Sequence, residues 1–75
     1  MENYKNVYGN SGVRAYQISK DAISIMFSDG KTYKYTYEST GWQSIEIMKE
    51  LAQKGVGLTT FINQRVRNRY AERMN

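Results

Sequence analysis

The sequence predicts an α+β domain in which a three-stranded antiparallel meander is followed by two helices packed on one face (β-β-β-α-α). Two alternating apolar segments, residues 23–27 and 33–37, flank a turn sequence and indicate a β-hairpin. Further along the chain, apolar residues recur every three to four positions over residues 42–54 and again over 58–73. This spacing indicates two amphipathic helices that can cover the hairpin.

The turn Ser28-Asp29-Gly30 fixes the register of the hairpin. A two-residue loop at Asp29-Gly30 would turn the tyrosines of the second strand away from the isoleucines of the first. A three-residue loop, with Gly30 in the left-handed conformation of a bulge, pairs Ile25 with Tyr33 and keeps both on one face. We therefore expect this face to be buried and to carry Ile23, Ile25, Phe27, Tyr33 and Tyr35. The opposite face is expected to expose Ser24, Thr32 and Thr36.

A third strand is expected before the hairpin, from Val13 to Ser19. Tyr16 and Ile18 are expected to point inward, although Val13 and Ala15 also fit the opposite phase. Short connections between the three segments favour a meander. Residues 1–12 show no period and are rich in Gly, Asn and Ser at positions 9–12, so we expect a mobile N-terminal segment, from which Tyr4 and Tyr8 could still pack against the domain. The single domain is then expected over residues 13–75.

The first helix is expected to begin at Thr40, which with Gln43 matches a capping box, and to end at Lys54-Gly55. Its apolar face comprises Trp42, Ile45, Met48, Leu51 and Ala52. The second helix follows a flexible joint at residues 55–57, with Thr59 or Thr60 as its cap. Its buried stripe is expected to comprise Leu58, Ile62, Val66 and Tyr70, and the next row Phe61, Arg65, Arg69 and Arg73.

Composition limits the chemistry that the chain can perform. There is no cysteine and no histidine, so thiol chemistry and the commonest metal ligand are absent. No paired carboxylates or phosphate-cradling glycine loop appears at motif spacing, so we expect a protein that is not an enzyme and uses no metal or cofactor. No apolar run approaches the ~18 residues of a membrane span, and the expected setting is the cytoplasm, without a membrane partner.

The charge is placed unevenly along the chain. The net charge is +4, yet residues 1–53 carry six basic and six acidic side chains, which cancel. Residues 54–75 carry Lys54 and four arginines against Glu72 alone. A run of arginines with almost no interleaved acid is less common on an ordinary solvated face, so contact with phosphates is one interpretation of this segment.

With this order of elements, the sequence resembles the KTSC domain family, which is named for its place at the C-terminus of some lysyl-tRNA synthetases and also occurs as single-domain bacterial and phage proteins. The matching residues are Ser11 before Val13-Arg14, Tyr33-Lys34-Tyr35, and the closing pattern of Asn63, Val66 and Tyr70. The match spans most of residues 11–71, and the joint at residues 55–58 is longer than the commonest form of the family. The resemblance implies an RNA-binding role, which rests on association with a tRNA synthetase.

Three groups of residues are candidates for binding. Arginine suits phosphate because its planar fork can hold two oxygens at once, so a phosphate-binding edge is predicted from Lys34, Arg65, Arg67, Arg69 and Arg73. The simpler alternative is a structural role, in which the aliphatic parts of these arginine side chains cover core aromatics and their charged groups keep the helix hydrated. Tyr37, at the end of its strand, is the tyrosine expected to be partly open for base stacking, whereas core packing is the simpler role of the tyrosine row. Asn63 either bonds the backbone of the joint or contacts a ligand.

Two functions from different classes follow. The first is a nucleic-acid-binding module, with RNA as its partner, that uses the basic second helix. The second is a protein-interaction module, such as a small phage or mobile-element factor docking on a host protein through the open sheet face or a strand edge. A continuous positive surface with flanking aromatics favours the first, and an apolar surface around Met26 favours the second.

Overall fold

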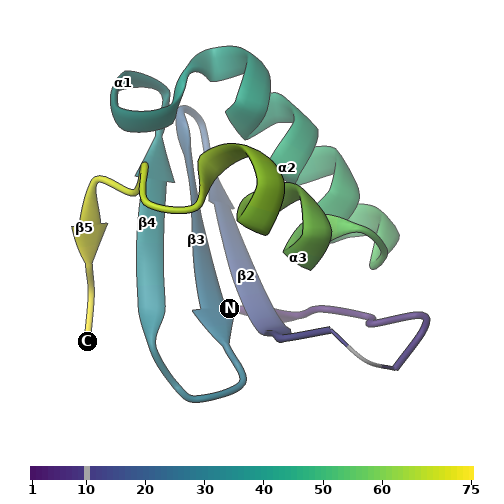
Figure 1. Ribbon diagram of the computed structural model, residues 1–75. Helices are drawn as coiled ribbons and strands as arrows, with labels where there is room; N and C mark the ends of the chain where they lie inside the picture. Colours follow the sequence, from purple (N-terminus) through teal and green to yellow (C-terminus); the bar gives the residue numbers. More distant parts are fainter. Residues whose placement is uncertain (10) are drawn as a thin grey trace.

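The computed structural model describes residues 1–9 and 11–75; Asn10, within the predicted N-terminal segment, lies outside the described residues. It shows one antiparallel sheet in the order β1-β2-β3-β4-β5, with the helices on one of its faces (Figure 1). The strands are β1 (Glu2–Asn3), β2 (Val13–Ser19), β3 (Ala22–Phe27), β4 (Thr32–Thr36) and β5 (Glu72–Arg73). The helices are α1 (Tyr37–Thr40), α2 (Trp42–Lys54), α3 (Leu58–Phe61) and the π-helical turn η1 (Ile62–Val66). The α+β class is confirmed, and two short edge strands are added to the three predicted ones.

The hairpin has the predicted register. Ile25 lies opposite Tyr33, and Ile23 lies opposite Tyr35. The Phe27 N–H donates to the Lys31 carbonyl at 2.9 Å, and the Gly30 N–H donates to the Phe27 carbonyl at 2.9 Å. Gly30 has φ +89°, the left-handed conformation that the bulge requires. Both isoleucines and Tyr35 are fully buried under the helices, as the register argument expected.

The core side of β2 includes residues of both phases that the sequence allowed. Tyr16 is buried and Ile18 packs against the core, as predicted. Val13 also belongs to the core, because the register between β2 and β3 shifts between Val13 and Ala15. A bulge of this kind adds one residue to a strand and changes the face to which the following side chains point.

The start of the first helical region differs from the prediction. Thr36 caps α1, and its hydroxyl and that of Ser39 form a capping box. Thr40 is not a cap but a buried residue whose hydroxyl donates to the Arg69 carbonyl at 2.7 Å. Gly41, with φ +98°, separates α1 from α2. The end of α2 is as predicted, because Gly55 adopts the left-handed conformation and its N–H donates to the Leu51 carbonyl at 2.9 Å.

Trp42 was expected in the core and is 60% exposed, so this prediction is wrong. It is the first residue of α2, directly after the break at Gly41, and Ile45 is the first residue of this helix to be buried. The buried face of α2 is carried instead by Ile45, Met48 and Ala52.

The second predicted helix ends earlier than its apolar spacing indicates. It begins after Gly57, which is its N-cap in place of Thr59 or Thr60, and ends through the π-helical turn at Val66. A turn follows, in which the Arg69 N–H donates to the Val66 carbonyl at 2.8 Å. The chain then runs down beside β4 as β5 (Figure 1). A helix that continued to Arg73 would have left the edge of β4 without partners.

Pairing with the C-terminal residues also changes what is exposed on β4. The Thr32 N–H donates to Asn75 Oδ1 at 2.8 Å, and the Thr32 carbonyl accepts from the Met74 N–H at 2.8 Å. Thr32 is therefore buried, and the prediction that it faces solvent is wrong. Ser24 and Thr36, also expected to be exposed, are half-buried, and Tyr33 is only half-buried although the core was expected to cover it.

The N-terminal residues pack against the domain. The Tyr4 N–H donates to the Arg14 carbonyl at 2.9 Å, and the buried Tyr4 hydroxyl accepts from the Leu58 N–H at 3.3 Å. The Val7 N–H donates to the Gly55 carbonyl at 2.9 Å. Tyr4 thus joins the core, whereas Tyr8 is exposed.

Candidate functional site

Four aromatic rings form a contiguous group where β3 and β4 meet the chain after η1. The ring centroids of Tyr33 and Tyr70 lie 4.6 Å apart, those of Tyr35 and Tyr70 6.2 Å, and those of Phe27 and Tyr33 5.9 Å. Tyr35 is 1% exposed, and burial, with smaller contributions from Tyr33 and Tyr70, raises its pKa to about 12. Tyr70 is 37% exposed, so the expectation that it belongs to a buried helical stripe is wrong. Its ring contacts two other rings, and more than a third of the residue is open to solvent.

This group forms part of a small cavity, which we term the aromatic cleft. Its volume is about 180 Å³, and it is lined by Phe27, Tyr33, Tyr35, Ile62, Asn63, Arg67, Asn68 and Tyr70. The sheet supplies the floor, and the segment from Ile62 to Tyr70 supplies the wall. The π-helical turn is the local cause of this arrangement, because it ends the helix at Val66 and lets Tyr70 return over β4. Single π-helical turns inside helices frequently occur at functional sites.

The charge beside the aromatic cleft is positive. Arg67 lines it, and Arg73 lies opposite Tyr33 in the β4–β5 register. Residues paired across neighbouring strands point to the same face, so Arg73 lies beside Tyr33 on the side of the helices. None of the described residues that line the cleft carries a carboxylate. The acidic neighbour Glu72 pairs with Lys34 and so belongs to the opposite face of the sheet.

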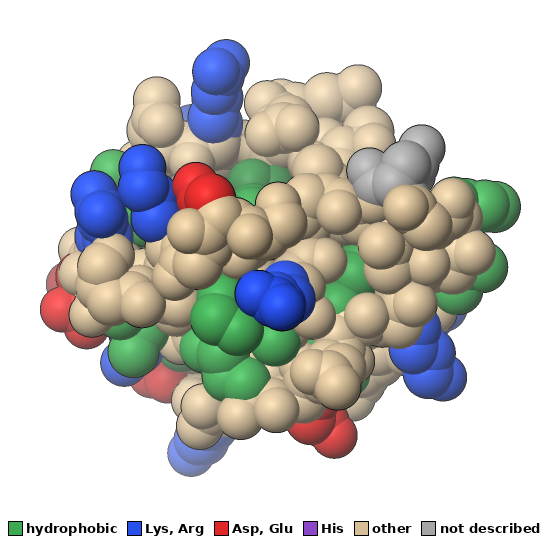
Figure 2. Space-filling model, turned by 90° about the horizontal axis from the view of Figure 1, so that it is seen from below, with side chains coloured by type: hydrophobic (Ala, Val, Ile, Leu, Met, Phe, Trp, Pro, Cys, Tyr) green, Lys and Arg blue, Asp and Glu red, His purple; other side chains and the backbone are tan. Residues whose placement is uncertain are grey.

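The predicted row of four arginines on one helix is wrong. Arg65 lies in η1 and Arg67 directly after it, but Arg69 lies in the following turn and Arg73 in β5. The row fails because the helix ends at Val66. All four side chains are exposed; Arg67 lines the aromatic cleft, whereas Arg73 lies opposite Tyr33 in the β4–β5 register and its Nε donates to the Asn75 carbonyl at 2.6 Å. Figure 2, which views the end of the molecule at the β3–β4 turn, shows basic side chains at several separate places, with hydrophobic side chains among them.

Two further predicted residues lie away from the aromatic cleft. Lys34 pairs with Ser24 and Glu72 on the face of the sheet opposite the helices. Tyr37 lies in α1, where its hydroxyl donates to Glu46 Oε2 at 2.6 Å and Lys49 Nζ is 5.5 Å from its ring centroid. The hydrogen bond to Glu46 raises the pKa of Tyr37 and lowers the pKa of the Glu46 carboxyl. Tyr37 is partly open, as predicted, but it is engaged in this local network.

Asn63 lines the aromatic cleft together with Asn68. Within the described residues it makes no hydrogen bond to the joint at residues 55–58, so the simpler role expected for it is wrong. Its amide, which has both donor and acceptor groups, is available to a molecule in the cleft. Asn68 was missed, because it lies in a turn that the helical prediction had made part of a continuous helix.

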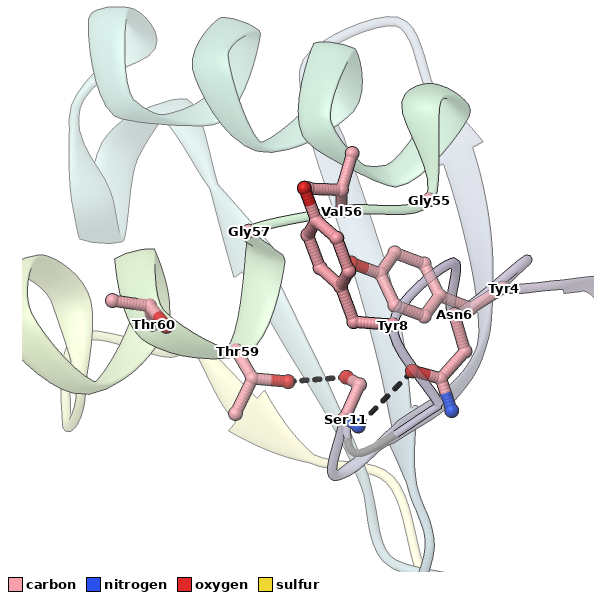
Figure 3. Close-up of a pocket in the computed structure, with 9 residues that line it drawn as sticks. All are labelled: Tyr4, Asn6, Tyr8, Ser11, Gly55, Val56, Gly57, Thr59 and Thr60. Carbon is pink, nitrogen blue, oxygen red and sulfur yellow. Dashed lines mark hydrogen bonds between the residues drawn. The ribbon is translucent and has the colours of Figure 1, made fainter.

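A larger cavity of about 390 Å³ lies between the N-terminal segment and the α2–α3 joint (Figure 3). Its lining is uncharged and comprises Tyr4, Asn6, Tyr8, Ser11, Gly55, Val56, Gly57, Thr59 and Thr60. The Ser11 and Thr59 hydroxyls are 2.5 Å apart, and Asn6 Oδ1 accepts from the Ser11 N–H at 3.0 Å (Figure 3). These bonds tie the N-terminal segment to α3. Ser11 carried part of the family resemblance, but no local pattern indicated this cavity or placed Thr59 beside it.

The face of the sheet opposite the helices carries methionines. Met26 pairs with Thr32, and the Met74 N–H donates to the Thr32 carbonyl, so the three residues lie in a row across β3, β4 and the C-terminal strand. The Ser24 hydroxyl contacts Met74 Sδ at 3.6 Å. Met74 is exposed and Met26 is half-buried. We term these residues the methionine row; Lys34 and Glu72 lie on the same face of the sheet.

The described part of the chain shows no group of three or more His, Cys, Asp or Glu side chains that could hold a metal ion. None of its helices has the length and apolar character needed to cross a membrane. A scan against protein-family models, a search of curated proteins and a search of solved structures each found no match to this chain.

Proposed function

We propose that the protein is a small, non-enzymatic, KTSC-like module that binds nucleic acid, with RNA as its partner, through the aromatic cleft. Four of the residues that carry the family resemblance support this proposal by their location. Tyr33, Tyr35, Asn63 and Tyr70 come from two distant parts of the sequence and line the same cleft. Val66 is buried beside them in the core.

One observation carries the proposal: a partly exposed, well-supported aromatic ring lies beside arginines in a cleft without carboxylates. Tyr70 rests on Tyr33 and Tyr35, so its orientation is fixed before a ligand arrives. A base that stacks on such a ring gains about 1–3 kcal/mol. Arg67 lines the cleft and Arg73 lies opposite Tyr33 in the β4–β5 register, and we propose that both contact phosphates next to that base.

The proposal is tested by titrating the protein with fluorescently labelled tRNA, single-stranded RNA and duplex DNA at several salt concentrations. Each phosphate contact on a single strand contributes about −0.7 to the slope of log K against log salt. Contacts by Arg67 and Arg73 alone predict a slope of about −1.4, and participation of Arg65 and Arg69 would bring it to about −2.8. No detectable binding to any of the three at low salt would contradict the proposal.

Charge-neutralising variants separate the aromatic cleft from general basicity. The double variant Arg67→Gln/Arg73→Gln should weaken binding and make the salt slope shallower by about 1.4. Its matched control is Lys20→Gln/Lys54→Gln, which removes the same charge from exposed positions outside the cleft lining. Equal loss of affinity in the two double variants would place the binding surface elsewhere.

A protein-interaction module is the second candidate, and the methionine row favours it. Methionine side chains are adaptable and polarisable, and they are common on surfaces that bind protein partners. The variant Met74→Lys should abolish partner binding through this face and leave nucleic-acid binding unchanged. If the titrations show no nucleic-acid binding, this face becomes the better-supported surface, with a host protein as the expected partner.

A further inference from the structure

We infer that the ligand of the aromatic cleft is a single-stranded segment from which one unpaired base stacks on Tyr70. This inference rests on the proposed function and names its ligand class. The observation that leads to it is the geometry of the ring cluster. The Tyr70 ring contacts Tyr33 and Tyr35, and 37% of the residue remains exposed, so part of Tyr70 is free to receive another ring.

A base that stacks on the exposed part of Tyr70 presents its flat face to the ring. In a duplex, the faces of the bases are covered by their neighbours in the stack, and only the groove edges and the backbone are accessible. Single strands can splay a base away from its neighbours and place its face on an aromatic side chain. A duplex could therefore use the arginines beside the cleft but not Tyr70.

The cleft also contains side chains that can form hydrogen bonds with the edge of the stacked base. Asn63 and Asn68 line it, and their amides can each donate and accept hydrogen bonds. Arg67 lines the cleft, and Arg73 lies opposite Tyr33 in the β4–β5 register, so both guanidinium groups are near the backbone of a strand whose base stacks on Tyr70. A stacking ring, edge-contacting amides and flanking guanidinium groups together form a site for one nucleotide within a longer strand.

The first experiment compares single-stranded RNA, single-stranded DNA and blunt duplex DNA of one sequence, each of about ten nucleotides, within the usual site size of such modules. Tyr70→Leu should weaken single-strand binding about 5- to 150-fold, and Tyr70→Phe, which keeps the ring, should change it by less than about 3-fold. Tyr8→Leu, at an exposed tyrosine outside the aromatic cleft, is the matched control and should have no effect. Duplex binding should be weaker and insensitive to Tyr70→Leu.

A second measurement leaves the protein unchanged, in case Tyr70→Leu disturbs the fold. A strand of about ten stable abasic nucleotide analogues keeps the phosphates and removes every base. Restoring one central base should recover about 5- to 150-fold in affinity. No recovery, or equal affinity for duplex and single strand, would overturn this inference and leave a phosphate-binding module. No detectable binding of any of these strands to the unmodified protein would instead overturn the proposed function itself.

Discussion

The substitution Gly55→Ala tests how the N-terminal segment packs across the end of α2. Gly55 has φ +78°, in the left-handed region that side chains disfavour. A Cβ added there would also lie 2.5 Å from Lys5 Cβ and 3.3 Å from Lys5 Cα. The new methyl group would therefore meet two separate penalties, one from its own backbone and one from the N-terminal segment.

The two penalties have known magnitudes. A left-handed conformation costs a residue with a Cβ about 1–2 kcal/mol. Forcing a methyl group into a packed contact costs about 1–3 kcal/mol more. We expect Gly55→Ala to lower the free energy of unfolding by about 2–5 kcal/mol, measured by guanidinium denaturation with the m-value checked for constancy. Gly30→Ala is the matched control: Gly30 has φ +89°, but no described atom lies within 4 Å of the added Cβ, so only about 1–2 kcal/mol should be lost.

A double-mutant cycle then isolates the contact with Lys5. Lys5→Gly in the Gly55→Ala background removes the nearest atom and should recover part of the lost stability, with a coupling free energy above about 0.5 kcal/mol. Equal losses in Gly55→Ala and Gly30→Ala, together with zero coupling, would refute the close packing of the N-terminal segment. The result would then agree with a mobile segment over residues 1–12.

Three further predictions concern the core, the C-terminal strand and the pH dependence of stability. Ile25 is fully buried, so Ile25→Ala should cost about 2–5 kcal/mol of unfolding free energy in thermal or chemical denaturation, and an unchanged midpoint would contradict its position. Thr40→Val removes the hydroxyl that donates to the Arg69 carbonyl, so it should lower the free energy of unfolding by about 0.5–1.5 kcal/mol. It should also speed amide hydrogen exchange at Ala71 and Met74, which bond to β4. Unchanged exchange would show that the Thr40–Arg69 bond does not hold the C-terminal strand. Burial raises the pKa of Tyr35 to about 12, above the ordinary value of 10.0, so with rising pH the Tyr35 hydroxyl loses its proton first in the unfolded chain. The contribution of protonated Tyr35 to the free energy of unfolding is therefore complete below pH 10 and lost between pH 10 and 12. Tyr35→Phe should flatten the decline of stability in that window, and an identical decline would contradict the assigned burial.

The central hairpin could be predicted because its signals are local. Alternation at Ile23, Ile25 and Phe27 and the freedom of Gly30 to be left-handed allow only one register with a continuous apolar face. The end of α2 at Gly55 has the same character, because one glycine after a cation is sufficient to stop a helix. Each of these predictions depends on a few neighbouring residues and is confirmed.

The C-terminal segment could not be predicted from local spacing. Leu58, Ile62, Val66 and Tyr70 fit a helical stripe, and Gly and Pro are absent from the segment after Gly57. The helix ends because the edge of β4 needs hydrogen-bond partners and Tyr70 gains contacts with two rings, and both requirements arise from residues distant in sequence. Tertiary contacts of this kind routinely override helix propensity. As a result, the sequence indicates a basic segment but not where its arginines lie in the fold, and it does not predict the aromatic cleft.

The late position of β5 in the sequence has a consequence for the order in which the domain assembles. The contacts among β2, β3 and β4 join near neighbours along the chain, whereas the pairing of Tyr33 with Arg73 closes a long loop and carries a larger entropic cost. We expect the meander and α2 to form first and the C-terminal strand to dock last. The strand pairs over two residues at the edge of the sheet and is held besides by a few hydrogen bonds of its neighbouring residues, so it can also detach at a lower free energy than global unfolding requires. The wall of the aromatic cleft that carries Tyr70 would then exchange between docked and detached states while the rest of the domain stays folded, and a nucleic-acid strand would bind the docked fraction and increase it.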